Sequence, residues 1–318
     1  MRLHAGTSGF SYDEWHGRFY PADLPAAERL TSYSTRLESV EINNTFYQTP
    51  KAPLLERWAS QVPAGFRFAL KAPRRITHIQ RLKGSAESLG YFWNAASALG
   101  DKLGPVLFQL PPFARKDAVL LAEFLAQLPA ALMPAFEFRH ESWFDDEIYG
   151  LLRGRNAALC AGDAEDGDRS PPLVATADFG YLRLRAPSYD AAGLRAWSQK
   201  ILTQPWSQAF AYLKHEVLGP DYAVFFAAVA EGRSEPPFPE PLPEPVPVAM
   251  AMAKRKAAKG AKSDQDANAD KRAKTDNSAK TDNSAKAQKP TKESKPKARP
   301  KDERRAKART GRTSRKPS

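Results

Sequence analysis

The sequence of 318 residues contains a single cysteine, Cys160, and no long hydrophobic run. One cysteine excludes an intramolecular disulfide and a cysteine-based zinc ribbon. The lack of about 20 consecutive apolar residues excludes a membrane-spanning helix, and residues 1–6 lack the apolar stretch of a signal peptide. We therefore expect a cytoplasmic protein with no membrane partner.

Histidine is also scarce. The chain has five, which are His4, His16, His78, His140 and His215. They show neither HxH nor HExxH spacing, whereas zinc and two-metal sites need a convergent set of His, Asp and Glu. Lysine and arginine in the same cavity would repel a divalent cation. We therefore expect no metal and no cofactor.

The positive charge is confined to one part of the chain. Residues 249–318 hold 23 Lys/Arg and 8 Asp/Glu, whereas residues 1–248 hold 25 and 28. Between them, residues 236–247 contain seven prolines, which favour an extended polyproline II spacer. We predict a folded domain over residues 1–232, a Pro-rich linker over 233–248, and a disordered basic tail over 249–318.

Within the first 232 residues, β-rich runs alternate with amphipathic segments that have helical periodicity. We predict strands at Leu3–Thr7, Ser39–Asn43, Arg67–Lys71, Val106–Leu110, Ala135–Arg139, Ala158–Gly162, Tyr181–Arg185 and Phe210–Lys214. Eight strands with intervening helices are typical of an α/β protein with a (β/α)8 TIM-type barrel. A doubly wound open sheet is the alternative, but no GxGxxG motif follows the first strand.

Several distinctive motifs occur in a recognisable order. They are Gly6–Tyr12, Val40–Tyr47, Phe108–Pro112, Glu137–His140 and the pair Ser142-Trp143. Over roughly residues 1–230 the chain resembles the YecE-like family of bacterial proteins, also called domain of unknown function 72. The resemblance implies a TIM-type barrel and no established reaction.

Two segments depart from the pattern of that family. The family commonly has Arg-x-His-Gly where this chain has Arg183–Ala186. Its last strand often ends in Phe-Asn-Asn, whereas this chain reads Leu213-Lys214-His215-Glu216, a variant found in part of the family. Chemistry that depends on those histidine and asparagine positions is therefore in doubt here.

Alternation along the predicted strands divides apolar from charged side chains. Val40 and Ile42 share one face of their strand, and Glu41 lies on the other. Because the apolar faces should meet the helices, the polar faces should point into the barrel. The inward set comprises Glu41, Asn43, Lys71, Gln109, Glu137, Arg139, Tyr181, Arg183, Arg185, Tyr212 and Lys214.

The inward set places acids and bases near the carboxyl ends of the strands, where TIM-barrel active sites form. Glu137 and Glu41 are candidate general acids or bases, and Lys71 is a candidate to activate a carbonyl or hold an oxyanion. His140 is a candidate to titrate near neutral pH or, alternatively, to cap the next helix. A structural alternative for the set is a lattice of ion pairs, such as Glu41–Lys71 and Glu137–Arg183.

The surplus of cations over acids in this set favours an anionic ligand. Aromatic residues in the loops at the same end offer an apolar wall for a ring, although packing of the loops would equally explain each one. The predicted substrate-binding residues are Asn43, Gln109, Arg139, Arg183, Arg185, Lys214, Tyr12, Trp15 and Trp143.

Two classes of function follow. One is an enzyme that acts on a phosphate- or carboxylate-bearing small molecule or polymer at the barrel mouth. The other is a non-catalytic protein that binds a ligand or nucleic acid and whose basic tail contacts polyanions nonspecifically.

Overall fold

The computed structural model describes residues 1–163 and 171–240. Eight parallel strands form a closed barrel in sequence order, and β1 pairs with both β2 and β8. The strands are β1 Arg2–Ser8, β2 Ser39–Ile42, β3 Arg67–Lys71, β4 Leu103–Gln109, β5 Pro134–Glu137, β6 Ala158–Gly162, β7 Phe179–Leu184 and β8 Gln208–Leu213. All eight predicted strands are present, and the predicted TIM-type barrel is confirmed.

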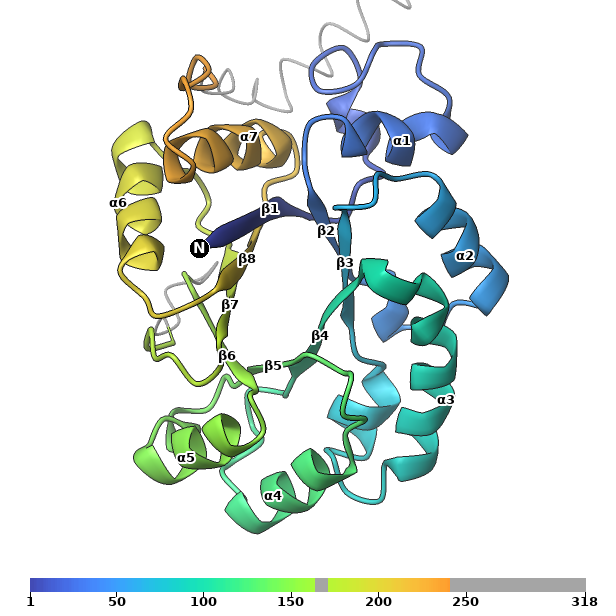
Figure 1. Ribbon diagram of the computed structural model, residues 1–318, viewed down its shortest axis with the longest axis vertical. Coiled ribbons are helices and arrows are strands. Elements are labelled where there is room, and N and C mark those ends of the chain that lie inside the picture. The colour runs from blue at the N-terminus through green and yellow to red at the C-terminus, as the bar shows by residue number, and fades with distance from the viewer. Residues whose placement is uncertain (164–170, 241–318) are drawn as a thin grey trace, which may run out of the picture. The chain divides into compact units, whose positions relative to one another are not determined.

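Seven α-helices of the described chain form a ring outside the strands (Figure 1). They are α1 Arg29–Ser34, α2 Ala52–Ser60, α3 Ala86–Ala96, α4 Ala118–Gln127, α5 Asp146–Gly154, α6 Ala191–Leu202 and α7 Gly219–Ala230. The carboxylates of Asp117, Asp145 and Asp190 accept backbone N–H bonds at the starts of α4, α5 and α6. These caps satisfy donors that a helix cannot pair within itself.

The strands bury their two faces against different surroundings. Val40, Phe68 and Phe136 belong to the large core in which the strands pack on the helices. The opposite face fills the barrel with a separate apolar cluster of Ala69, Leu107, Ala135, Ala158, Cys160, Phe179, Tyr181, Phe210 and Tyr212. The predicted alternation is therefore confirmed. The inward charged residues Glu41, Glu137 and Arg183 stand at or next to the carboxyl ends of their strands.

The segment after α7 begins the predicted Pro-rich linker. Phe238 packs against Tyr222 and Phe225 of α7, with ring centroids 5.8 and 5.0 Å apart. The linker from residue 241 onward and the whole predicted basic tail lie outside the described residues. In the described part of the chain, no helix is long and apolar enough to cross a membrane.

Candidate active site at the barrel mouth

Arg183, on β7, connects two buried glutamates inside the barrel. Its Nη1 lies 2.7 Å from Oε2 of Glu137, and its Nη2 lies 3.0 Å from Oε2 of Glu41. Its Nε also lies 2.9 Å from Oε1 of Glu41. The three residues are at most 5 % exposed, so the fork of the guanidinium compensates two carboxylates that would be costly to bury alone.

Glu41, near the end of β2, is fully hydrogen-bonded. Tyr181 Oη donates to its Oε1 at 2.8 Å, while Ser8 Oγ and Asn43 Nδ2 donate to its Oε2 at 2.7 and 3.0 Å. Burial alone would raise the pKa of Glu41, but Arg183 and these hydrogen bonds hold it below its ordinary value. The carboxylate is therefore ionised at neutral pH.

Glu137, the last residue of β5, contacts further guanidinium groups. Arg139 Nε and Arg185 Nη2 donate to its Oε1 at 3.1 and 3.2 Å. Although burial opposes ionisation, Arg183, Arg185 and Arg139 together lower the pKa of Glu137 to about 2. Three arginines therefore converge on one carboxylate, and their charge exceeds what it can neutralise.

Lys71, the last residue of β3, lies at the same end of the barrel. Its Nζ lies 4.5 Å from the centroid of the Phe46 ring. Burial, followed by the nearby Arg183, lowers the pKa of Lys71 to about 8. The suggested Glu41–Lys71 pair is wrong, since Arg183 is the cation that pairs with Glu41 in the described structure, whereas the suggested Glu137–Arg183 pair is present.

A separate set of hydrogen bonds fixes the loop that follows β7. Asp163, just after β6, accepts the backbone N–H groups of Arg185 and Ala186 and the hydroxyl of Tyr189. Gly162, the residue before Asp163, allows β6 to lie close to β7 at this point, because an added Cβ would lie 2.0 Å from the carbonyl oxygen of Arg183. The Asp163 carboxylate therefore fixes the position of the Arg185 backbone, from which its side chain extends.

The remaining polar candidates have different positions. Gln109 is buried at the end of β4, directly beside Glu137 in the strand register. Lys214 is exposed in the residue after β8. His140 Nδ1 accepts the backbone N–H of Ser142 at 3.1 Å and so caps the short helix Glu141–Trp143, as one of its two predicted roles requires.

The predicted aromatic wall needs correction. Trp15 and Trp143 are only 1 and 2 % exposed. Their indole N–H groups donate to the backbone oxygens of Glu216 and Ala114, each at 2.7 Å, and Trp143 also stacks on Phe138 with centroids 4.4 Å apart. Both rings therefore pack and fix loops, and their burial leaves them no face for a ligand.

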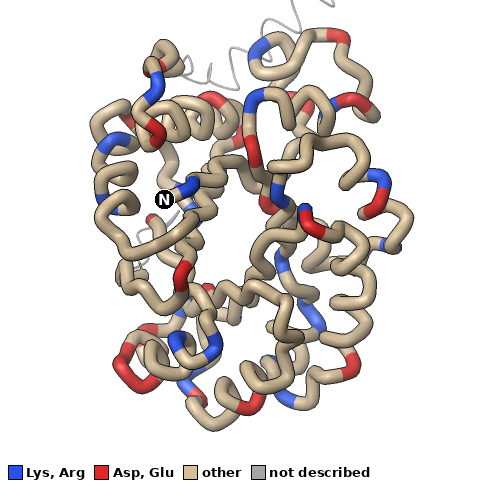
Figure 2. The backbone as a smooth tube through the Cα atoms, in the orientation of Figure 1, with Lys and Arg blue, Asp and Glu red and all other residues tan. Residues whose placement is uncertain are grey.

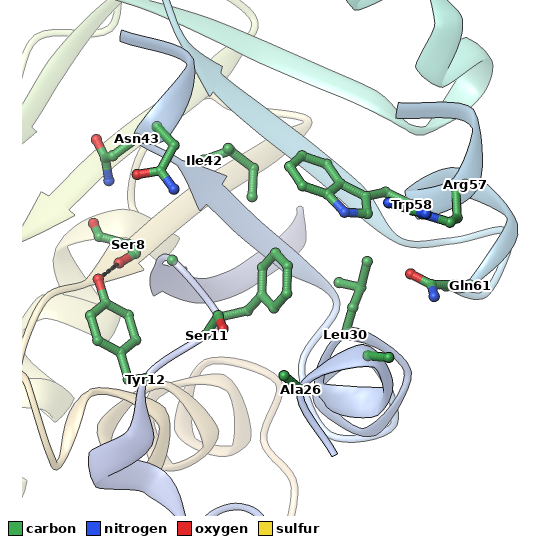
Figure 3. A pocket seen from close by; sticks show the side chains of 14 residues that line it. Ser8, Ser11, Tyr12, Ala26, Leu30, Ile42, Asn43, Arg57, Trp58 and Gln61 are labelled. Atoms are coloured by element: carbon green, nitrogen blue, oxygen red, sulfur yellow. Dashed lines mark hydrogen bonds between the residues drawn. The ribbon is translucent and has the colours of Figure 1, made fainter. Parts of the chain in front are cut away.

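An aromatic wall does exist, in a cavity of about 600 Å³ beside the mouth (Figure 3). Phe10 and Trp58 line this cavity, and their rings form a T-shaped pair with centroids 6.0 Å apart. Tyr12, a predicted contact, lines the opposite side, where its hydroxyl donates to the Ser8 carbonyl at 2.6 Å. Sequence reasoning missed Trp58 because it lies on helix α2, away from the strand ends.

The charges at the mouth contrast with those around the ring of helices. There, residues of both signs are interspersed along the described chain (Figure 2), and residues 1–248 carry nearly equal numbers of basic and acidic groups. At the mouth, Lys71, Arg139, Arg183 and Arg185 face two glutamates. No group of three or more His, Cys, Asp or Glu in the described residues is arranged to hold a metal ion.

Comparison with known proteins places this barrel in a family. The model of the family described as "Protein of unknown function DUF72" matches residues 4–245. The chain belongs to the DUF72 family. Among curated DUF72-like relatives, it is 32% identical to UPF0759 protein YecE of Escherichia coli K12 over 128 residues, which is 39% of this chain and 47% of YecE.

A second curated relative and two solved structures are also similar to this chain. The chain is 29% identical to UPF0759 protein YunF of Bacillus subtilis over 142 residues, 42% of this chain and 50% of YunF. It therefore matches about half the length of these curated relatives. Its fold is similar to those of DUF72 proteins from Thermotoga maritima (TM-score 0.64, 23% identity, 73% of this chain and all of that one) and Enterococcus faecalis (TM-score 0.61, 17% identity, 76% of this chain and all of that one).

Proposed function

We propose that the protein is an enzyme whose barrel mouth binds the phosphate or carboxylate group of its substrate. The observation that carries this proposal is the convergence of Lys71, Arg139, Arg183 and Arg185 on only two carboxylates at the carboxyl end of the barrel. Guanidinium groups, which can donate two parallel hydrogen bonds, and a partly buried lysine favour a bound anion. The substrate anion would lie against Lys71, Arg139 and Arg185, since Arg183 is enclosed between the glutamates.

The pKa values divide the roles within this site. With a pKa of about 2, Glu137 is a poor proton acceptor near neutral pH, where a general base works best with a pKa close to the working pH. Lys71, with a pKa of about 8, exchanges its proton within the physiological range. We assign proton transfer to Lys71 and assign Glu41 and Glu137 to holding the arginines in place.

The binding of inorganic phosphate tests the anion site directly. Lys71→Met and Arg139→Gln should each weaken phosphate binding about tenfold, the usual loss for one charge-assisted hydrogen bond. Because Lys71 loses its proton as pH rises through about 8, binding to the wild type should weaken over that range, beyond any change caused by phosphate itself. In Lys71→Met this weakening should disappear. Isothermal titration calorimetry from pH 6.5 to 9.5 measures both effects.

An exposed arginine on α5 provides the matched control. Arg153→Gln removes one exposed positive charge from the last turn of α5, outside the group of charges at the mouth, and should leave phosphate affinity unchanged. Equal affinity in the wild type, Lys71→Met and Arg139→Gln would contradict the anion site. A screen of phosphorylated and carboxylated metabolites with the wild type and Lys71→Met then tests turnover.

A non-catalytic alternative is favoured by the composition of residues 249–318, where 23 of 70 residues are Lys or Arg. Such a segment should bind polyanions by releasing their counterions, and without aromatic residues it should not select a sequence. The test compares the full chain with residues 1–242, the first compact unit, for binding to mixed-sequence double-stranded DNA at low and moderate salt. Binding that needs the tail and weakens steeply with salt supports this alternative, whereas equal affinity of both proteins contradicts it.

A further inference from the structure

The cavity beside the mouth is a site that the proposed activity does not use. It lies between the loops that follow β1 and β2 and the helices α1 and α2, as Figure 3 shows. Its volume of about 600 Å³ falls within the range of small-molecule sites, about 300–1,000 Å³. It is lined by Ser8–Tyr12, Ala26, Ala27, Leu30, Ile42–Asn44, Arg57, Trp58 and Gln61.

We infer that this cavity binds a planar ring that carries one anionic group. The apolar part of the lining is formed by Phe10, Leu30, Ile42 and Trp58. Phe10 and Trp58 are half-buried, and their T-shaped arrangement presents both an aromatic face and an aromatic edge. A flat ring gains most from such a pair, because aromatic rings prefer offset or edge-to-face contact.

Arg57 specifies the charge of the ligand. It is the one charged side chain in the lining, and no Asp or Glu shares the cavity. Within the described structure its guanidinium makes no ion pair or hydrogen bond, and it is exposed at the edge of the cavity on α2. An anionic substituent on the ring would accept a bidentate pair of hydrogen bonds from this guanidinium.

Amide groups supply the polar contacts at the edge of the ring. The Asn43 amide N–H₂ already donates to Glu41, and so does the Ser8 hydroxyl. The side chains of Asn44 and Gln61 make no hydrogen bond within the described structure and remain available to a ligand. Amides both donate and accept, so they fit ring substituents such as hydroxyl, amino or keto groups.

Three matched probes separate the contributions of ring and charge. Phenyl phosphate carries both, phenol carries the ring alone, and inorganic phosphate carries the charge alone. Phenyl phosphate should bind at least about tenfold more tightly than either of the others, measured by ligand-observed NMR and titration calorimetry on the full chain. Equal affinity of the Lys71→Met variant, in which the anion site at the mouth is weakened, for phenyl phosphate and inorganic phosphate would overturn the assignment of a ring site.

Substitutions on the two exposed sides of the cavity locate the binding without disturbing the core. Arg57→Gln should lower phenyl phosphate affinity about tenfold and leave phenol unchanged. Ala26→Phe, at an exposed position that lines the cavity, should fill the space and abolish the binding of both ring compounds. The exposed Arg153→Gln is the control and should change neither. Unchanged binding of phenyl phosphate to both cavity variants would overturn the inference.

The same probe distinguishes this cavity from the anion site at the mouth. Binding in the cavity does not require the proposed activity, so Lys71→Met should leave the affinity for phenyl phosphate within about twofold of the wild type. A loss in Lys71→Met without a loss in Arg57→Gln would place the phosphate at the mouth. That result would overturn the cavity assignment while supporting the proposed anion site. Loss of phosphate binding at the mouth alone would leave the cavity assignment standing.

Discussion

The two ends of the barrel interior are built from the same inward strand faces, yet their chemistry is opposite. Along β7 the inward residues change from Phe179 through Tyr181 to Arg183. At the amino end, Phe179 and Phe210 pack edge to face with centroids 6.2 Å apart, and no charge is needed to fill the space. At the carboxyl end, the same faces present two buried glutamates and the arginine that joins them.

This contrast shows which end of the barrel interior stabilises the fold and which end contributes little or unfavourably to its free energy. Apolar rings in the barrel gain free energy simply by leaving water. Buried ions do not, because the loss of hydration roughly cancels their attraction unless every partner is present. The polar network is concentrated at the end where TIM-barrel sites form, and its cost in stability supports the proposed anion site there. Substitutions at each end provide direct tests of this difference.

The largest effect is expected from Arg183→Met. It leaves Glu41 without an ion-pair partner in the described structure and removes one of the three arginines at Glu137. An uncompensated buried charge should lower the free energy of unfolding by about 3–5 kcal/mol. Urea denaturation at pH 7 measures the loss.

A double variant sharpens this test. Adding Glu41→Gln to Arg183→Met removes the stranded charge, while Glu137 keeps Arg139 and Arg185, and should restore most of the lost stability. A loss below about 1 kcal/mol in Arg183→Met, similar to that of the exposed control Arg153→Gln, would show that the network is not stabilised by its central arginine.

The second effect belongs to the opposite end of the barrel. His4 is buried on β1, where it stacks on Phe210 with centroids 4.7 Å apart and its Nδ1 has no partner in the described structure. Burial, and then Arg2 and Arg67, lower the pKa of His4 from 6.5 to about 4. Between these values the unfolded chain binds more protons, so stability is full above about pH 6.5 and falls as the pH drops to about 4.

The loss at pH 4 should reach roughly 3 kcal/mol, the free-energy equivalent of that pKa shift. His4→Phe keeps a ring on Phe210 and should remove this slope, as measured by urea denaturation at pH 7, 5.5 and 4.5. Glu137 should contribute little above about pH 4.5, because its stabilisation is lost only as the pH falls from its ordinary pKa of 4.5 towards about 2. An unchanged slope in His4→Phe would place the acid sensitivity elsewhere.

The barrel and the inward set were predictable from sequence because both depend on alternation along single strands. Val40 and Glu41 had to lie on opposite faces, whatever the partner strands were. The pairing of Glu41 with Arg183 instead of Lys71 was not predictable, because β2 and β7 are not neighbours in the barrel order and only their tilt and register bring these side chains together.

Loop aromatics were harder still to predict. Trp15 and Trp143 occur in motifs after strands, just as exposed binding residues would, and only their burial shows that they fix the loops. Trp58 and Arg57 lie within helix α2, whose periodicity reveals a buried face but not a cavity at its edge. Sites formed between elements depend on distances that a single sequence pattern does not contain.

The smallest effect is expected from Tyr189→Phe, which removes a hydroxyl that donates to Asp163 and accepts the backbone N–H of Ala186 at the mouth. The Tyr189 hydroxyl donates to Asp163 at 2.7 Å, and burial together with Asp163 raises its pKa above the ordinary value, so it remains a neutral donor. Its loss should cost about 1 kcal/mol of unfolding free energy, because Asp163 keeps the backbone N–H groups of Arg185 and Ala186. Asp163→Ala, which removes all three contacts, should cost more. If this clamp also positions Arg185 for an anion, phosphate affinity should fall in the same order, from wild type to Tyr189→Phe to Asp163→Ala. Stability that falls while phosphate affinity stays constant would mean that the clamp belongs to the supporting part of the barrel and not to its mouth.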